Sequence, residues 1–390
     1  MSYGSYRYTK AEVDLDKITF NFKSMQNHIS AGTQLMAVIK ADAYGHGAVE
    51  VARHLEKQGV DYLAVAVMDE AIELRSAGIT CPILLLSPIE PDTIPTAVRW
   101  DITLTIFSER IAAAVQAFAR ITKKTVKVHV KVDTGMGRIG ARTEEETLRL
   151  CQLLNADNIF CEGIFTHFAE AENTADPSFT KKQFKAFIGT VDYLQDKGFN
   201  FSLRHCSNTA AAMLYPEFDL DMIRTGISLF GYHPDPALKQ LLDLKPALTL
   251  TTHAAMIKSV PAGQTIGYGR TYKTEKEETI ATLLLGYADG IPRELSNRWY
   301  LTSKKHKASI VGRICMDQLM VNVTDIPDFS YEDELVFIGD PDKGHPSIYT
   351  MADLTDSFHY EILCGIGKRI PRVYTKGEAV KAKQNVLLDR

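Results

Sequence analysis

Basic side chains follow several apolar runs in the first part of this 390-residue chain. Lys40 closes the first run, Lys131 closes a later one, and His167, His205 and Arg224 stand at the ends of three more. Taken singly, each is more simply explained as a solvated strand end. Cationic and imidazole side chains that converge on one place repel each other unless an anion lies among them. Together they therefore indicate a site for an anionic ligand.

The segments that must position these side chains alternate between short strands and amphipathic helices, which is typical of repeated βα units. The expected strands cover residues 34–39, 61–67, 82–86, 102–107, 126–132, 159–166, 201–205 and 222–224. The expected helices include residues 48–58, 69–77, 109–122, 144–155 and 179–197. Eight such units in roughly 200 residues predict a closed (β/α)8 barrel. A doubly wound sheet is the second choice, because no G-x-G-x-x-G follows the first strand.

The pattern changes after about residue 240. Short apolar runs separated by Pro, Gly and Asp predict strands at residues 248–259, 279–286, 308–311, 319–323 and 334–338, and one helix is expected at 351–364. We therefore predict an α/β protein with two domains, a barrel at 1–240 and a β-strand-rich domain at 241–390. Residues 1–14 are candidates for pairing with the second domain.

Active sites of βα barrels lie at the carboxyl ends of the strands, where Lys40 and the other basic residues are expected. A lysine there is desolvated and close to other cations. Both effects lower its pKa and free its amine for Schiff-base chemistry. Pyridoxal 5'-phosphate (PLP) would supply the carbonyl for this amine and the phosphate for the basic residues. The turns at 207–209 and 224–227 offer backbone N–H groups to that phosphate.

Composition narrows the classes of partner. The formal net charge of -4, with both signs interspersed, argues against nucleic acid and anionic membrane surfaces. No apolar run has the length of a signal peptide or a membrane span, so we expect a cytoplasmic protein. The six cysteines are scattered without metal-ligand spacing, and no metal site is predicted.

Several motifs in order along the chain resemble those of alanine racemase, a fold-type III PLP enzyme, over essentially the whole length. In the barrel these motifs are VIKADAYGHG at 38–47, KVDTGMGR at 131–138, FTHF at 165–168, HCSNTAA at 205–211 and RTGI at 224–227. In the β domain they are IGYGRTY at 266–272, GYADG at 286–290 and CMDQ at 315–318.

The resemblance implies a role for each matching residue. Lys40 matches the Schiff-base lysine and Tyr44 a tyrosine that touches the phosphate. Lys131 matches a lysine that is often carbamylated, and Arg138 the arginine that it orients toward cofactor and substrate. The remaining residues around the cofactor are His167, His205, Asn208, Thr209, Arg224, Gly226 and Ile227.

The β domain is expected to supply the second base and the substrate contacts. Tyr268 matches the second catalytic base, although alone it would read as a core or turn aromatic. Met316 and Asp317 match a substrate-contacting loop, and Tyr287 matches a tyrosine of the entry corridor. Lys368 stands where a phosphate-binding tyrosine is expected, so this reading leaves substrate strictness open.

Racemisation removes the α-proton from one face and returns a proton to the other, so two acid/base groups on opposite faces are the simplest arrangement. Lys40 is expected to handle the proton of the D-isomer and Tyr268 that of the L-isomer. Arg224, facing the pyridine nitrogen, would keep that nitrogen unprotonated and so limit side reactions.

Alternative functions remain open at this point. A broader serine/alanine racemase is left open by Lys368, whose shape differs from that of the expected tyrosine. A fold-type III amino-acid decarboxylase carries an acidic residue where this chain has Arg224. A non-enzymatic PLP carrier would leave the β domain unexplained. The resemblance further implies a head-to-tail homodimer, with Lys40 from one subunit and Tyr268 from the other in one site, that supplies D-alanine for peptidoglycan.

Overall fold

The computed structural model describes residues 6–388 and divides the chain into two compact units. The barrel unit comprises Thr19–Ala43 and Val51–Leu244. The β-rich unit comprises Met1–Ile18, Tyr44–Glu50 and Lys245–Arg390.

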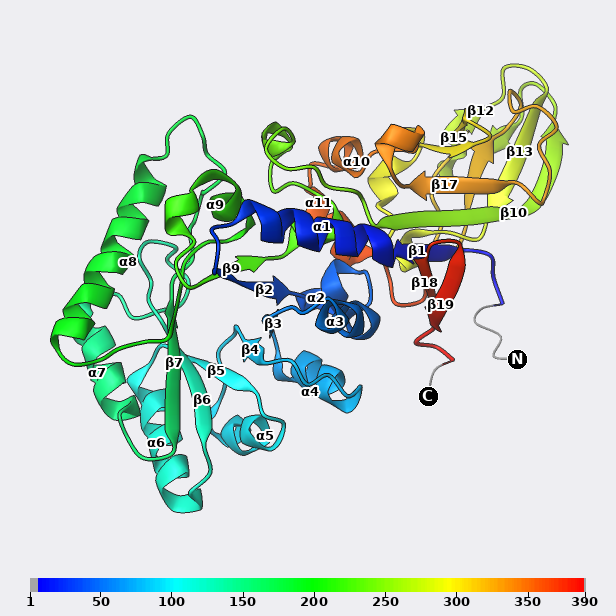
Figure 1. Cartoon of the computed structure of the whole chain (residues 1–390). Coiled ribbons are helices and arrows are strands. Elements are labelled where there is room, and N and C mark those ends of the chain that lie inside the picture. The colour runs from blue at the N-terminus through cyan, green and yellow to red at the C-terminus, as the bar shows by residue number, and fades with distance from the viewer. Residues whose placement is uncertain (1–5, 389–390) are drawn as a thin grey trace. The chain divides into compact units, whose positions relative to one another are not determined.

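The barrel unit is built on eight parallel strands surrounded by helices (Figure 1). The strands are β2 (Gln34–Val38), β3 (Tyr62–Val65), β4 (Ile83–Leu85), β5 (Thr103–Ile106), β6 (Val126–Lys131), β7 (Ile159–Phe165), β8 (Leu203–His205) and β9 (Met222–Thr225). Their order in the sheet is β8-β7-β6-β5-β4-β3-β2-β9. Strands β3, β4 and β5 are buried along their whole length, and β3 and β4 accordingly have uninterrupted apolar sequences, whereas β5 alternates Thr with Leu and Ile.

The barrel closes where its last strand returns to its seventh. Strand β9 pairs with β2, and the N–H of Asp221, just before β9, donates to the carbonyl of Arg204 in β8 at 3.1 Å. The same two residues form an ion pair of 2.7 Å between Arg204 Nε and Asp221 Oδ2. The predicted (β/α)8 fold class is thereby confirmed.

Helices cover the outside of these strands. Those of this part of the chain are α1 (Leu15–His28), α3 (Ala48–Lys57), α4 (Met68–Ser76), α5 (Ile94–Arg99), α6 (Glu109–Thr122), α7 (Glu144–Leu154), α8 (Ser178–Asp196) and α9 (Thr209–Leu214). Side chains of Ser108 and Thr143 accept N–H hydrogen bonds and fix the starts of α6 and α7. Because these caps set where the helices begin, they also set how long each connection from the preceding strand can be.

The β-rich unit is mostly antiparallel. Its strands are β1 (Lys10–Asp14), β10 (Leu248–Val260), β11 (Thr265–Ile266), β12 (Tyr272–Lys273), β13 (Glu278–Leu283), β14 (Tyr300–Ser303), β15 (His306–Ile310), β16 (Leu319–Asn322), β17 (Glu334–Ile338), β18 (Arg372–Lys376) and β19 (Ala379–Gln384). Strand β13 pairs with both β16 and the long, bent β10, so six of these strands close into a small barrel. Strand β1 joins β10 on one side and β18 on the other.

The helix expected at residues 351–364 is wrong in extent. Two helices occupy this region, α10 (Ile348–Leu354) and α11 (His359–Gly365). Asp356 between them adopts φ 48°, a left-handed conformation that a continuing α-helix does not contain. The N–H of Ser357 then returns to the carbonyl of Ala352. A local polar turn therefore overrides the apolar periodicity.

Candidate active site

The strand ends of the barrel unit bring the predicted basic residues together. Lys40 lies two residues beyond β2, Lys131 is the last residue of β6, and His205 is the last residue of β8. Arg224 belongs to β9, and His167 follows β7 by two residues. Because all these strands are parallel, the five residues share one end of the barrel.

The Arg224 guanidinium is almost completely buried and makes hydrogen bonds through both terminal nitrogens. NH1 donates to Nδ1 and to the carbonyl of His205, both at 3.0 Å. NH2 donates to the carbonyl of Thr166 at 2.8 Å and contacts Nδ1 of His167 at 3.2 Å. No carboxylate of the described residues forms an ion pair with it. Its Nε–H donates to no residue in the described part of the chain.

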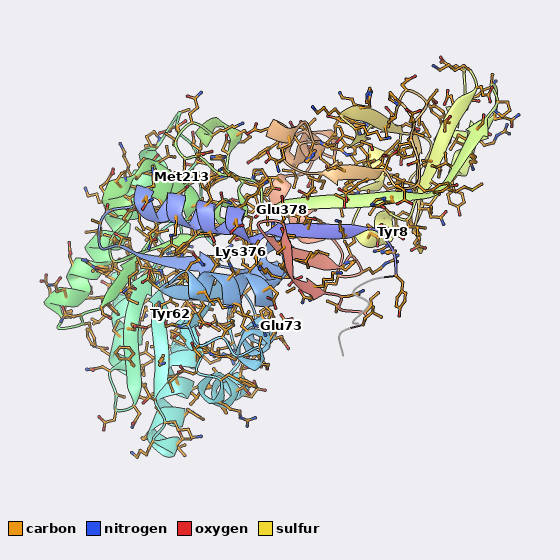
Figure 2. The ribbon with its side chains drawn as sticks, turned by 45° about the vertical axis from the view of Figure 1, so that its right-hand side comes forward. Tyr8, Tyr62, Glu73, Met213, Lys376 and Glu378 are labelled. Carbon is orange, nitrogen blue, oxygen red and sulfur yellow. The ribbon has the colours of Figure 1, made fainter. Side chains whose placement is uncertain are left out.

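Hydrogen bonds to Arg224 fix the tautomer of His205. Since Arg224 donates to Nδ1, the proton of a neutral His205 ring lies on Nε2, which faces Nδ1 of His129 at 3.0 Å. His129 must then carry its proton on Nε2, which lies 3.4 Å from Glu162 Oε2. Glu162 also accepts from the hydroxyl of Tyr62 on β3, labelled in Figure 2. Burial lowers the pKa of both histidines, so the rings stay neutral.

Lys131 is a buried amine among cations. Burial lowers the pKa of Lys131 well below its ordinary value, and the charges of Arg224 and Arg138 lower it further. Its Nζ lies 4.5 Å from the centre of the Phe165 ring. Asp133 alone favours the charged amine, but its carboxylate already accepts the N–H groups of two glycines. A neutral amine is therefore favoured, which is the form that reacts with CO2.

His167 lies within the same field of positive charge. Its pKa falls well below the ordinary histidine value because of burial first, and then because of Arg224, Lys131, Arg138 and Lys40. The structure thus brings all five of these groups within electrostatic reach of one another. Arg138 itself is exposed, whereas Lys40 is half-buried.

Lys40 opens a short left-handed turn. The turn is α2 (Lys40–Tyr44), in which Ala41, Asp42, Ala43 and Tyr44 all have φ between 52° and 54°. Non-glycine residues adopt this conformation at a cost of about 1–2 kcal/mol each, and runs of them are rare. The N–H of Ala41 donates to Glu70 Oε1 at 2.6 Å, which helps to hold the turn. Strain of this kind is concentrated at functional sites.

In the two turns that were expected to bind phosphate, some polar groups already form hydrogen bonds within the protein. Asn208 accepts the N–H of Ala211 and caps α9. Thr209 Oγ1 accepts the N–H of Gly226 at 3.1 Å. Ile227 begins the 3-10 helix η3 (Ile227–Phe230), and its N–H donates to no described residue. Of these groups, Ile227 therefore has a backbone donor left for a ligand.

In the β-rich unit a second tyrosine lies beside Tyr44. The ring centroids of Tyr44 and Tyr360 are 6.0 Å apart, and Tyr360 lies on α11. Burial raises the pKa of Tyr44, so it stays a neutral hydroxyl. The sequence predicts a cofactor contact at Lys368, which lies at an exposed turn position, and it does not single out Tyr360. The only signal for Tyr360 was its place in an amphipathic segment, eleven residues before the final Pro-Arg pair.

The other predicted residues of the β-rich unit lie at its surface. Tyr268 is 69% exposed and starts the 3-10 helix η5 (Tyr268–Arg270) between two glycines with φ 72°. Met316 is 53% exposed and Tyr287 41%. Asp317 forms an ion pair with Arg369, from its Oδ1 to NH2 at 2.8 Å.

The barrel site fits a phosphate-bearing cofactor. Arg224 is a buried cation whose partners among residues 6–388 are all neutral, and Lys131 is a buried amine within reach of its charge. Buried charges are normally paired, so an anion belongs here. Lys40 offers an amine at the same strand ends, and Ile227 offers a backbone N–H. No cluster of metal-ligating side chains occurs in the described residues.

Fold and site together define a class: a (β/α)8 barrel with basic side chains gathered at its strand ends, followed by a β-barrel unit. Family models of the alanine racemase N-terminal domain and C-terminal domain match residues 13–234 and 247–374. The chain belongs to the alanine racemase family. It is 46% identical to alanine racemase 2 of Oceanobacillus iheyensis, over 98% of this chain and 97% of that protein. The resemblance seen in the motifs is thereby confirmed.

Solved structures of alanine racemases have the same fold as this chain. An alanine racemase of Clostridium difficile 630 superposes with a TM-score of 0.93 at 39% identity, covering 97% of this chain and 98% of that one. The alanine racemase of Bacillus anthracis with bound L-Ala-P gives a TM-score of 0.91 at 35% identity over 98% and 99% of the two chains. No helix in the described part of this chain is long and apolar enough to cross a membrane.

Proposed function

We propose that this protein interconverts L-alanine and D-alanine, with PLP held on Lys40. The observation that carries the proposal is the buried Arg224, a guanidinium whose partners are all neutral and whose Nε–H is left over. It belongs to a chain that matches alanine racemases from end to end. When bound, the cofactor would withdraw electrons from the substrate and acidify its α-proton.

Protein side chains would then do the proton chemistry. Lys40 Nζ, once released from the cofactor, would take or return the proton on one face of the substrate, and the Tyr268 hydroxyl would act on the other. Arg224 would donate to the pyridine nitrogen and keep it unprotonated, since a guanidinium does not give up its proton near neutral pH. This restrains side reactions and distinguishes the chain from fold-type III decarboxylases, which place an acid there.

Lys131 is proposed to carry a carbamate. Its lowered pKa provides the neutral amine that attacks the carbon of CO2, and loss of one proton from the nitrogen to solvent would leave a carbamate anion beside Arg138. An anion there would orient the Arg138 guanidinium toward the cofactor and the substrate carboxylate. His167, His205, Asn208, Thr209, Gly226 and Ile227 are proposed to complete the cofactor surround.

Tyr360 is proposed to join Tyr44 at the phosphate. The two rings are neighbours, whereas Lys368 lies in an exposed turn. Tyr360 would then supply a hydroxyl to the phosphate in place of the missing tyrosine. The presence of Lys368 would no longer be a reason to expect a broad substrate range. A panel of amino acids tests this: alanine should be turned over much faster than serine, and equal rates would support the broader racemase.

A second copy of the chain is proposed to complete each site. Tyr268, Tyr287 and Met316 are exposed in one chain, as expected of residues that reach a partner's barrel. Mixing inactive Lys40→Ala and Tyr268→Phe proteins should restore part of the activity, because some sites then combine two intact halves. No gain after verified subunit exchange would place both bases in one chain.

Borohydride reduction tests the cofactor lysine. Reduction of the PLP-loaded protein followed by digestion should place the pyridoxyl group on the peptide that contains Lys40. Label on Lys131 or Lys368 instead would contradict the assignment. Supply of D-alanine for peptidoglycan and a cytoplasmic location follow from this function and remain predictions.

A further inference from the structure

Asp289 is a fully buried carboxylate in the β-rich unit that contacts two guanidinium groups. Its Oδ1 accepts from Arg7 NH2 at 2.7 Å and lies 3.2 Å from Arg369 Nε. Its Oδ2 accepts from Arg7 NH1 at 3.2 Å. The side chain of Asp289 is 0% exposed, against 19% for Arg7 and 38% for Arg369. Burial of a carboxylate is costly unless such partners are present.

The backbone around Asp289 is joined to the loop that carries Met316. Asp289 ends the 3-10 helix η6 (Tyr287–Asp289). The Tyr287 N–H donates to the carbonyl of Cys315 at 3.0 Å, and the Ala288 N–H to that of Met316 at 2.9 Å. The two backbones approach so closely that a Cβ on Gly286 would lie 2.3 Å from Met316 O. The Gly286 N–H in turn donates to Asp289 Oδ2.

Arg369 connects the same carboxylate to the tip of the loop. While its Nε faces Asp289, its NH2 donates to Asp317 Oδ1 at 2.8 Å. The carbonyl of Asp289 accepts the N–H of Gly367 at 2.8 Å, which fixes the segment that carries Arg369. Charges therefore alternate along Arg7, Asp289, Arg369 and Asp317. The exposed end of this chain of contacts lies within the CMDQ loop.

Arg7 adds a segment from the start of the chain. It lies next to Tyr8, which Figure 2 labels just before β1. Arg7 NH2 also donates to the carbonyl of Arg369 at 3.1 Å, and the hydroxyl of Thr9 donates to that of Leu284. Four separate stretches of sequence thus meet around Asp289, at its carboxylate or through the residues that contact it: residues 7–9, 284–290, 315–317 and 367–369.

We infer that Asp289 is a positioning residue that holds Tyr287, Met316 and Asp317 in a fixed relation at the substrate entrance. This inference rests on the proposed function, because it takes those three residues as entrance residues. The CMDQ loop connects β15 to β16 and has little regular structure of its own, so it would otherwise be mobile. The backbone hydrogen bonds of Tyr287 and Ala288 to the loop, and the contacts that lead from the buried Asp289 through Arg369 to Asp317, hold the loop in place of regular secondary structure.

Removal of the charge tests the inference while keeping the shape. In Asp289→Asn one oxygen still accepts, but Arg7 and Arg369 lose their common counterion and the Arg369–Asp317 contact loses its support. The matched control is Asp340→Asn, which removes another poorly exposed carboxylate of the same unit, paired with Lys17 at 3.1 Å, without a link to the loop. Both variants should lose stability, but Asp289→Asn alone should alter the loop.

The first readout uses the cofactor-free protein. With methionine methyl groups labelled by 13C, and the Met316 signal assigned through Met316→Leu, the Met316 signal should shift or broaden in Asp289→Asn and stay in place in Asp340→Asn. Arg369→Gln should resemble Asp289→Asn, which keeps the test decisive if the latter fails to fold. An unchanged Met316 signal in a folded Asp289→Asn protein, or in Arg369→Gln when Asp289→Asn fails to fold, overturns the inference.

The second readout is kinetic. A misplaced entrance should lower kcat/KM for alanine by about 10²-fold, the scale expected of displacements near 1 Å, with PLP content unchanged. Rates equal to those of Asp340→Asn would contradict a positioning role. If the unmodified protein does not racemise alanine at all, the proposed function fails, whereas the Met316 signal still decides the role of Asp289.

Discussion

The NH1 group of Arg224 lies 3.0 Å from Nδ1 of His205, and this contact decides where the proton of His205 resides. Arg224 can only donate, so Nδ1 must accept and Nε2 must carry the hydrogen. His205 Nε2 therefore donates to Nδ1 of His129, and the proton of His129 lies on Nε2, which faces the carboxylate of Glu162. A row of two neutral imidazoles thus lies between a buried guanidinium and a carboxylate.

Nitrogen NMR can test this arrangement directly. In cofactor-free protein labelled with 15N-histidine, His205 and His129 should both show a single tautomer with the proton on Nε2. The exposed His306 serves as the control and should sample both tautomers. A proton on Nδ1 of His205, or a doubly protonated ring at neutral pH, would contradict the contacts with Arg224.

Stability should depend on pH through the buried histidines. The pKa values of His129, His167 and His205 are lowered by burial, so in acid the unfolded chain binds protons that the folded chain does not. The free energy of unfolding should therefore fall as pH falls below about 6.5.

Urea unfolding of the cofactor-free protein at several pH values measures this effect. Carboxylates with lowered pKa values, such as Asp133 and Asp221, lose their contribution only nearer pH 4, so the two effects occupy different windows. In His129→Asn, the free energy of unfolding should depend less steeply on pH in the higher window, below about pH 6.5. A wild-type stability that is constant from about pH 7 to 5 would show that the buried rings do become protonated.

Lys131 should be needed for activity in its carbamylated form. Without added bicarbonate, Lys131→Ala should lose about 10²-fold in kcat, because Arg138 is no longer oriented, and a small carboxylic acid should restore part of it. Lys127→Ala, on the same strand but half exposed and paired with Asp101, should retain full activity. Absence of rescue would argue against a carbamate.

The left-handed conformation of Ala41, directly after Lys40, should determine how substitutions at this position change the free energy of unfolding. Its side chain is exposed, so a substitution there tests the backbone and little else. Ala41→Gly should leave the free energy of unfolding unchanged or raise it by up to about 1 kcal/mol, while Ala41→Val should lower it by about 1–2 kcal/mol.

Ala113→Gly, at an exposed position within α6, is the matched control and should cost about 1 kcal/mol. Thermal or urea unfolding gives all three values. An Ala41→Gly variant destabilised as much as Ala113→Gly would show that the turn is not strained.

Strong periodicity made much of the fold predictable. The strands of the barrel contain short runs rich in apolar residues between turn residues, and the expected ranges overlap β2 to β9. Strands β14 and β18 were missed because neither has a long alternating pattern, and β14 gains its pairing from β15 and β17. The break between α10 and α11 depends on one left-handed aspartate, for which apolar spacing gives no warning.

The gathering of basic side chains in the candidate site could be predicted, because these residues stand at or directly after strand ends. Lys40, Lys131, His167, His205 and Arg224 were found in this way. The roles proposed for Tyr360 and Asp289 could not be predicted in this way, because each rests on contacts with residues far away in the sequence: Tyr360 with Tyr44, and Asp289 with Arg7 and Arg369. Tyr268 needed the family motif, since an exposed tyrosine in a glycine turn has no periodic pattern to mark it.

The central claim is most directly tested with purified, PLP-loaded protein and L-alanine alone. Optical rotation should decay to that of the racemic mixture with no release of CO2, and D-alanine should appear in equal amount. Lys40→Ala should abolish the change. Release of CO2 would instead identify a decarboxylase, and unchanged rotation with PLP bound on Lys40 would contradict the proposed racemase.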